Sequence, residues 1–141
     1  MTSRERRARL EQAYLDTVYR VSGPFCVLDL RIGVRSPALD RLLHRLGVRD
    51  WVFVTAWNPS SRAQPGWRNR ARQGRLARAL RGLHICLPGL GLPRDSRWQP
   101  EHSLFAAPVS AGRARRLGRR FGQNAVVAGR RGQPPALLWT G

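Results

Sequence analysis

The chain has 141 residues and a formal net charge of +18, from 26 basic side chains against 8 carboxylates. Hydrophobic residues make up 42% of it and include five tryptophans, a composition that allows a buried core and excludes a disordered polyelectrolyte. The length is near the commonest domain size, so we expect one α/β domain over residues 1–141.

All 26 basic residues are arginines, and the chain contains no lysine. The absence of lysine excludes Schiff-base chemistry, covalent pyridoxal phosphate and a Walker-type phosphate-binding lysine. A charge this high points first to a polyanion such as nucleic acid. Exclusive use of arginine is also typical of GC-rich genomes, so the charge alone does not identify a partner.

Targeting and cofactor signals are missing from the sequence. Residues 1–7 are mostly polar, and no apolar run approaches the length of a membrane span. Cys26 and Cys86 lack the spacing of a metal motif or a disulfide framework, and nothing suggests zinc. Gly89 and Gly91 begin a dinucleotide-binding pattern that fails at its third position. We expect a cytoplasmic protein with no metal or cofactor and no membrane partner.

Hydrophobic periodicity and turn residues predict the elements. Thr2 and Glu5 have capping-box spacing, and Ser36-Pro37 and Gly47 bracket a second helix. In chain order, we expect an amphipathic helix over 1–20, a strand over 25–32, a helix over 36–47, a strand over 51–56, a helix over 67–81, a strand over 83–87, a loop over 88–100, a strand over 103–109, a helix over 110–121, and strands over 124–128 and 135–139.

This order places the sheet-containing core in residues 25–139. It predicts a mixed sheet of about five or six strands flanked by three or four helices. Residues 103–128 form a strand-helix-strand unit, whose two strands should run parallel if they share the sheet.

Polar residues gather at the ends of three predicted strands. One group follows the buried strand over 51–56, where ligands bind in many α/β folds, and two groups precede the strands that begin near 103 and 124. If those strands run antiparallel to the first, the groups meet at one edge of the sheet. We call this set the polar cluster: Thr55, Asn58, Ser60, Asn69, Glu101, Ser103, Gln123 and Asn124.

The polar cluster has two interpretations. It can line a pocket for a small ligand or a protein partner, or its amides can brace loops by bonding to one another. Asn69 and Gln73 share the inward face of their predicted helix with Leu76 and Leu80, which is compatible with both. We take the ligand- or partner-binding domain as the leading function.

Catalysis has one candidate, Glu101. A hydrolase or transferase using it is an alternative, but paired-carboxylate chemistry needs a second acid, and Asp95 is the nearest in sequence. No spacing recommends a histidine as partner of Ser60 or Ser103. The sequence therefore favours binding over an enzyme.

A second alternative is an arginine-driven nucleic-acid-binding protein. Arginines surround the exposed sides of the predicted helix over 67–81, and Trp57, Trp67 and Trp98 could stack on bases. No known nucleic-acid motif is present, so weak, salt-sensitive binding is expected. The arginines of this alternative are Arg68, Arg70, Arg72, Arg75, Arg78 and Arg81.

Three short motifs resemble a known family. They are Thr55-Ala56-Trp57-Asn58-Pro59-Ser60, Trp98-Gln99-Pro100-Glu101-His102-Ser103 and Phe121-Gly122-Gln123-Asn124-Ala125. Together they are similar to the small bacterial proteins grouped as the domain of unknown function family numbered 3293. The resemblance extends over most of the chain. It implies an uncharacterised protein, since the family has no established activity to carry over.

Overall fold

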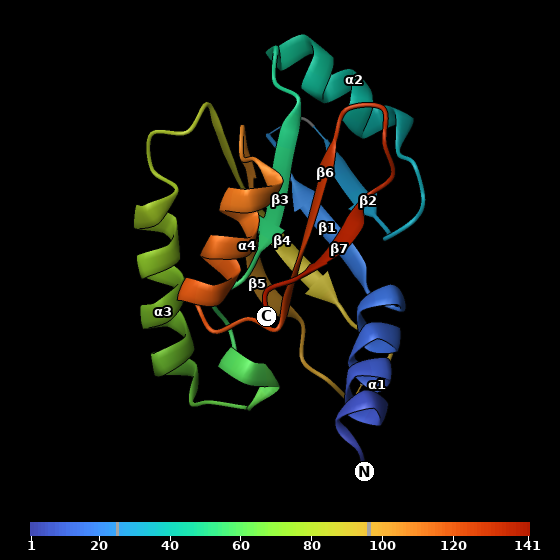
Figure 1. Ribbon diagram of the computed structural model, residues 1–141. Helices are drawn as coiled ribbons and strands as arrows, with labels where there is room; N and C mark the ends of the chain where they lie inside the picture. Colours follow the sequence, from blue (N-terminus) through green and yellow to red (C-terminus); the bar gives the residue numbers. More distant parts are fainter. Residues whose placement is uncertain (25, 96) are drawn as a thin grey trace.

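The computed structural model describes residues 1–24, 26–95 and 97–141 (Figure 1). In chain order its elements are α1 (Ser3–Leu15), β1 (Val18–Ser22), β2 (Val27–Leu30), α2 (Pro37–Leu46), β3 (Asp50–Val54), the 3-10 turn η1 (Pro59–Ser61), α3 (Gly66–Ala79), β4 (Ile85–Leu92), β5 (Glu101–Ala107), α4 (Ala111–Arg120), β6 (Ala125–Arg130) and β7 (Ala136–Trp139).

The seven strands form one curled antiparallel sheet, in the order β2-β1-β4-β5-β3-β6-β7. The sheet curls until its two edges approach each other. Gly33, after β2, donates its main-chain N–H to the carbonyl of Pro135, before β7, at 2.8 Å. Figure 1 shows β2 and β7 side by side at this seam.

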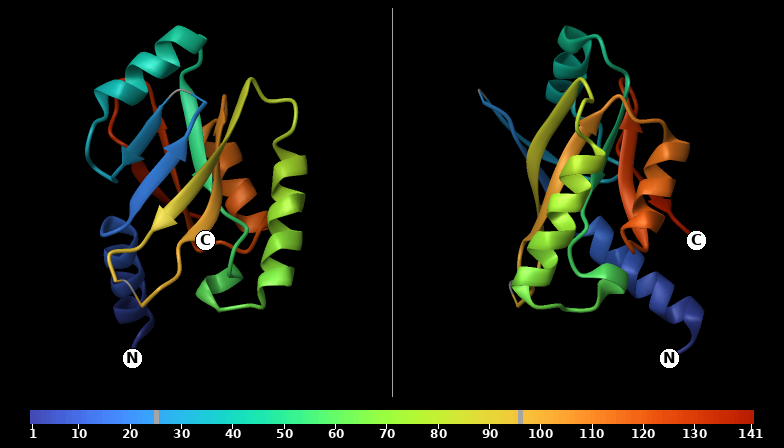
Figure 2. Two further views of the ribbon diagram at one scale, coloured as in Figure 1. Left: turned by 180° about the vertical axis from the view of Figure 1, so that it is seen from behind. Right: turned by 90° about the vertical axis from the view of Figure 1, so that its left-hand side faces the viewer.

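The sheet separates two hydrophobic cores, and β3 contributes to both. Trp51 and Phe53 point into the curl, where α2 covers one end through Leu39 and Leu43. Val52 and Val54 of β3 point the other way, toward α3 and α4, which pack side by side on the outer face (Figure 2). Because successive side chains of a strand alternate between faces, a strand covered on both sides is apolar throughout, as predicted for 51–56.

The predicted helix over 36–47 is confirmed together with its signals. The Ser36 hydroxyl accepts a hydrogen bond from the Leu39 N–H at 3.1 Å, and Pro37 occupies the first turn. Gly47 ends the helix with a φ of 67°, a left-handed conformation that glycine adopts without strain. Ser110 caps α4 in the same way, through the Arg113 N–H.

The α/β class is confirmed, but the predicted sheet is wrong in two respects. Within the described residues it has seven strands instead of five or six, and all their pairings are antiparallel instead of mixed. The strands of the 103–128 unit, β5 and β6, do share the sheet and a direction, because each is antiparallel to β3. They are not neighbours, since β3 lies between them. The four α-helices fall within the predicted three or four.

Two element boundaries also differ from the prediction. The first helix ends at Leu15 instead of 20, and none of its residues is buried. Residues 18–21 alternate instead in burial along β1, which pairs with β2 and β4. The predicted loop over 88–100 begins inside β4, where Gly89 has a packing role. A Cβ at Gly89 would lie 2.6 Å from the Phe53 ring, so the strand requires glycine there.

The strand predicted over 25–32 is observed as the shorter β2, and Phe25 itself lies outside the described residues. Among the helices that the structure describes, none has the length and apolar character needed to cross a membrane.

Candidate functional site

The antiparallel pairing of β3 with β5 and β6 brings the polar cluster together. Val54, the last residue of β3, pairs with Leu104 near the start of β5, and Phe53 pairs with Val127 near the start of β6. The segment after β3 therefore meets the segments before β5 and β6 at the same end of the sheet. This is the arrangement that the predicted site required.

Asn58 and Asn69 form the centre of the cluster. The Asn58 N–H donates to Asn69 Oδ1 at 2.9 Å, and Asn69 Nδ2 donates to Asn58 Oδ1 at 2.8 Å. Asn58 Nδ2 then reaches Glu101 Oε1 at 3.3 Å. Asn69 is only 2% exposed, on the face of α3 that packs against the sheet, as its spacing predicted.

The loop after β3 has an unusual backbone. Asn58, Ser60 and Ser61 have φ values of 45°, 57° and 58°, in the left-handed region that side chains other than glycine and asparagine seldom adopt. Two contacts hold this loop in place. The Thr55 hydroxyl donates to the His102 carbonyl at 2.6 Å, and the Ser60 N–H donates to the Gly122 carbonyl at 2.7 Å.

The remaining members of the cluster also form hydrogen bonds within the protein. Gln123 Nε2 donates to the Trp57 carbonyl at 3.1 Å, and Asn124 Nδ2 donates to Ser61 Oγ at 3.0 Å. The buried Ser103 hydroxyl donates to the carbonyl of Glu101 in its own strand, at 3.1 Å. Ser60 takes part through its main chain, and its side chain is exposed.

Two residues that the sequence analysis did not include in the cluster brace it. Arg72 donates to the carbonyls of Ala56 at 3.1 Å and Phe121 at 2.7 Å, tying the loop to the end of α4. Gln73 Oε1 accepts the Ala56 N–H at 3.0 Å. The inward spacing of Gln73 was a usable signal, but nothing in the sequence distinguishes Arg72 from the exposed arginines around it.

Tyr14 is a further missed neighbour. Burial raises the pKa of Tyr14 to about 12, and the negative charge of Glu101 adds to this rise, while the Ala125 N–H opposes it. The residue lies on α1, within the amphipathic helix predicted over 1–20, and no pattern in the sequence linked it to Glu101.

Glu101 is the one ionisable side chain in the polar cluster as defined above. Burial raises the pKa of its carboxyl above the usual value, and the hydrogen bond from Asn58 lowers it only partly. The four ion pairs among the described residues involve Asp29, Asp40, Asp50 and Asp95. Glu101 is therefore a half-buried carboxylate outside those pairs, in a chain with 26 arginines.

The comparison with protein-family models gives a match over residues 54–126, to the family described as "Protein of unknown function (DUF3293)". The match covers more than half of the 141 residues. The chain belongs to the DUF3293 family. Neither the search of the curated proteins nor that of the solved structures gave a match.

The DUF3293 segment contains the whole polar cluster. Thr55 lies one residue after its start and Asn124 two residues before its end, whereas α1 and Tyr14 lie outside it. The arginines of α3 and α4 also lie inside the segment. The family match therefore includes both candidate surfaces.

Two depressions on the described surface lie away from the polar cluster. One is lined by residues of α2 and the β6–β7 turn, among them Arg41, His44 and Arg131. The other lies between Asp16, Arg31 and Leu92. The predicted pocket at the cluster has no counterpart in either. What the structure establishes at the cluster is a hydrogen-bonded polar surface, much of it satisfied internally.

The second acid for paired-carboxylate catalysis is otherwise engaged. Asp95 forms an ion pair with Arg97 at 2.7 Å, and the hydrogen bonds from Arg97 hold the pKa of Asp95 to about 2. Within the described residues, no three side chains of histidine, cysteine, aspartate or glutamate gather as metal ligands would. Asp95 is therefore not available as a free second carboxylate for Glu101.

Proposed function

We propose that the protein binds a small polar ligand at the polar cluster, with the Glu101 carboxylate as its principal contact. The ligand would lie at the end of the sheet where the loop over 55–61 meets the start of β5. The observation that carries this proposal is the state of Glu101: half-buried, with a raised pKa, and outside the ion pairs of a strongly basic protein.

The surroundings of Glu101 support this proposal. Left-handed backbone at non-glycine residues costs free energy and is concentrated at ligand sites, and three such residues lie in the adjoining loop. Two amide atoms next to the cluster, Gln64 Oε1 and Gln73 Nε2, are buried without a partner among the described residues. Two buried amide atoms around the loop are therefore left without a hydrogen bond, whereas a purely structural network is expected to satisfy its buried polar groups.

The chemistry of these groups defines the ligand class. A carboxylate accepts hydrogen bonds, and a ligand that donates them gains most where burial has removed competing water. We infer a ligand with amine, amide or hydroxyl donors.

The proposal is tested by ligand-induced thermal stabilisation. Panels of amines, amides and polyols are screened against the wild-type protein, and hits are repeated on Glu101→Gln. The substitution keeps the size of the side chain but replaces one acceptor oxygen with a donor. We expect the ligand to raise the melting temperature of the wild type and to lose at least about tenfold in affinity on the variant.

Asp95→Asn is the matched control, because it also removes one carboxylate from the DUF3293 segment. Its carboxylate is already bound to Arg97 at the surface, so ligand binding should be unchanged. A ligand that stabilises Glu101→Gln as well as the wild type binds elsewhere, and that result would refute the role of Glu101.

A further inference from the structure

Acidic residues are absent from two long stretches of the chain. No aspartate or glutamate occurs between Asp50 and Asp95, and none follows Glu101. These stretches contain α3 and α4, the two helices that lie side by side on the outer face of the sheet (Figure 2). The layer formed by α3 and α4 therefore carries many arginines and no carboxylate of its own.

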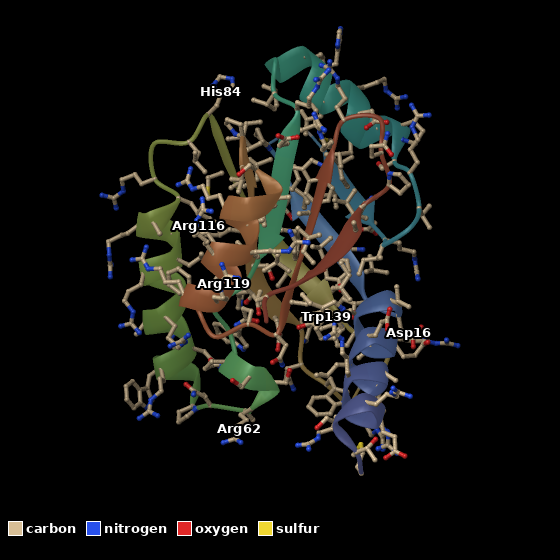
Figure 3. All side chains as sticks on the ribbon, in the orientation of Figure 1. Asp16, Arg62, His84, Arg116, Arg119 and Trp139 are labelled. Atoms are coloured by element: carbon tan, nitrogen blue, oxygen red, sulfur yellow. The ribbon has the colours of Figure 1, made fainter. Side chains whose placement is uncertain are left out.

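Ten arginines on or next to these helices form what we call the arginine face. Their side chains are exposed, except that Arg113 is half-buried, and none takes part in the four ion pairs among the described residues. Arg119 donates one hydrogen bond to the Thr140 carbonyl at 3.0 Å, but its side chain remains exposed. Figure 3 labels two of them, Arg116 and Arg119, along α4 next to α3. The arginine face consists of Arg68, Arg70, Arg75, Arg78, Arg81, Arg113, Arg115, Arg116, Arg119 and Arg120.

Arg72 does not belong to the arginine face, although it lies on α3. Its guanidinium donates to the carbonyls of Ala56 and Phe121, so its hydrogen-bonding capacity is directed inward. Only five of the six arginines first considered for nucleic-acid contact are thus directed to solvent.

An exposed tryptophan lies at the start of the same helix. Trp67 is 62% exposed, and the guanidinium of Arg68 lies 5.2 Å from the centre of its ring. A solvent-exposed indole at the end of a row of guanidinium groups is suited to binding unpaired nucleotides. Bases stack on the ring while arginines contact the phosphates.

Base composition of a genome does not explain this distribution. A bias toward arginine codons would replace lysines wherever they occur, but it would not remove carboxylates from two helices that share one surface. Each helix carries like charges three and four residues apart, which destabilise it. A polyanion bound across both helices would neutralise that repulsion.

We propose that the arginine face binds the phosphate backbone of a single-stranded nucleic acid, with Trp67 stacking on a base at one end. With 14 residues, α3 is about 20 Å long, enough to span several nucleotides. The binding is independent of base sequence, because its contacts are to phosphates and to the faces of bases. It is also separate from the ligand site at Glu101.

The test compares two variants with the same net charge. Arg75→Glu, Arg78→Glu and Arg116→Glu are combined in one protein, and Arg4→Glu, Arg6→Glu and Arg9→Glu of the exposed helix α1 in another. Binding of a labelled single strand of about 20 nucleotides is measured by fluorescence anisotropy at about 50 and about 150 mM salt. Circular dichroism and melting temperature verify that both variants fold.

The first variant is expected to lose at least about 30-fold in affinity, and the second less than about threefold. Each phosphate contact to a single strand contributes about 0.7 to the slope of log K against log salt, so the slope should fall by about 2 in the first variant only. Equal losses in the two variants would overturn the proposal, because net charge alone would then account for the binding.

Trp67→Ala tests the stacking contact in the same assay. We expect about a tenfold loss for the single strand and little change for a duplex of the same length, whose base faces are covered. Tighter binding of the duplex, unaffected by Trp67→Ala, would overturn the single-stranded assignment. Binding to phosphatidylglycerol vesicles without binding to the oligonucleotide would overturn it in favour of a membrane surface.

Discussion

The polar cluster and the arginine face use their polar groups in opposite ways. In the cluster, Asn58, Asn69 and Gln123 bond mainly to other groups of the protein, which holds the loop after β3 against α3 and the end of α4. On the arginine face, the guanidinium groups have no carboxylate among the ion pairs of the described residues. Hydrogen bonds made within the protein stabilise its fold, whereas a surface of guanidinium groups without nearby carboxylates is available to a partner. The two regions should therefore respond to substitution in different measurements.

The largest effect on stability is expected at Asn69. Asn69→Ala removes a buried amide that bonds to both the main chain and the side chain of Asn58, and it leaves the Asn58 main-chain N–H without its partner. We expect the free energy of unfolding to fall by about 2–4 kcal/mol, measured by urea denaturation. Arg70→Ala, next to it but exposed, should change it by about 0.5 kcal/mol or less. Similar losses in the two variants would show that the asparagine pair has no special structural role.

Two variants on α3 are expected to have opposite effects on stability and on oligonucleotide affinity. Arg72→Gln loses the hydrogen bonds to Ala56 and Phe121 and should lower the free energy of unfolding by about 1–3 kcal/mol, with little change in oligonucleotide affinity. Arg75→Gln should do the reverse, lowering affinity by about threefold and stability by about 0.5 kcal/mol or less. The measurements are urea denaturation and fluorescence anisotropy. If both variants affected both properties equally, the two regions would not be functionally distinct.

The smallest effect is expected from pH at Glu101. Its carboxyl pKa is raised in the folded protein by burial, so the folded state holds the proton more strongly than the unfolded state. The stability that protonated Glu101 contributes is present below the ordinary value of 4.5 and is lost as pH rises through the raised folded pKa.

Urea denaturation of the wild type and Glu101→Gln over about pH 3 to 8 measures this loss. The wild type should become less stable relative to the variant as pH rises through that interval. A difference that is constant with pH would show that Glu101 has no raised pKa in the folded protein.

Local signals predicted the helices between sheet strands well. Ser36 and Ser110 as caps, Pro37 in the first turn and Gly47 at the end act within one or two turns, so a short window of sequence contains the whole interaction. The continuous apolar run of β3 was similarly informative, because burial on both faces leaves no polar positions.

The sheet was harder to predict because its pairings are distant in sequence. Residues 18–21 fit either the end of a helix or a strand, and only the distant partner β4 decides between them. Pro88 and Gly89 resemble a loop in composition, yet Gly89 is required in β4 by the Phe53 ring. The insertion of β3 between β5 and β6 likewise depends on contacts that no local pattern records.

The polar cluster was predictable in part, for a related reason. The end of one strand meets the start of its antiparallel neighbour, so the proximity of Asn58 to Glu101 depended on a pairing of β3 with β5 that the sequence left as a condition. Arg72 could not be recognised, because its partners are main-chain carbonyls distant in sequence. The effect of Glu101 on Tyr14 likewise joins residues that no local pattern connects.

The seam between β2 and β7 bears on the solubility of the protein. Both edge strands of an open sheet expose unpaired main-chain groups that can recruit a strand from another molecule. Here the curl brings the two edges together through the contact of Gly33 with Pro135, and each edge strand has only four residues. This contact closes the seam at one point, and substitutions that widen the seam would expose the main-chain groups of both edges at once.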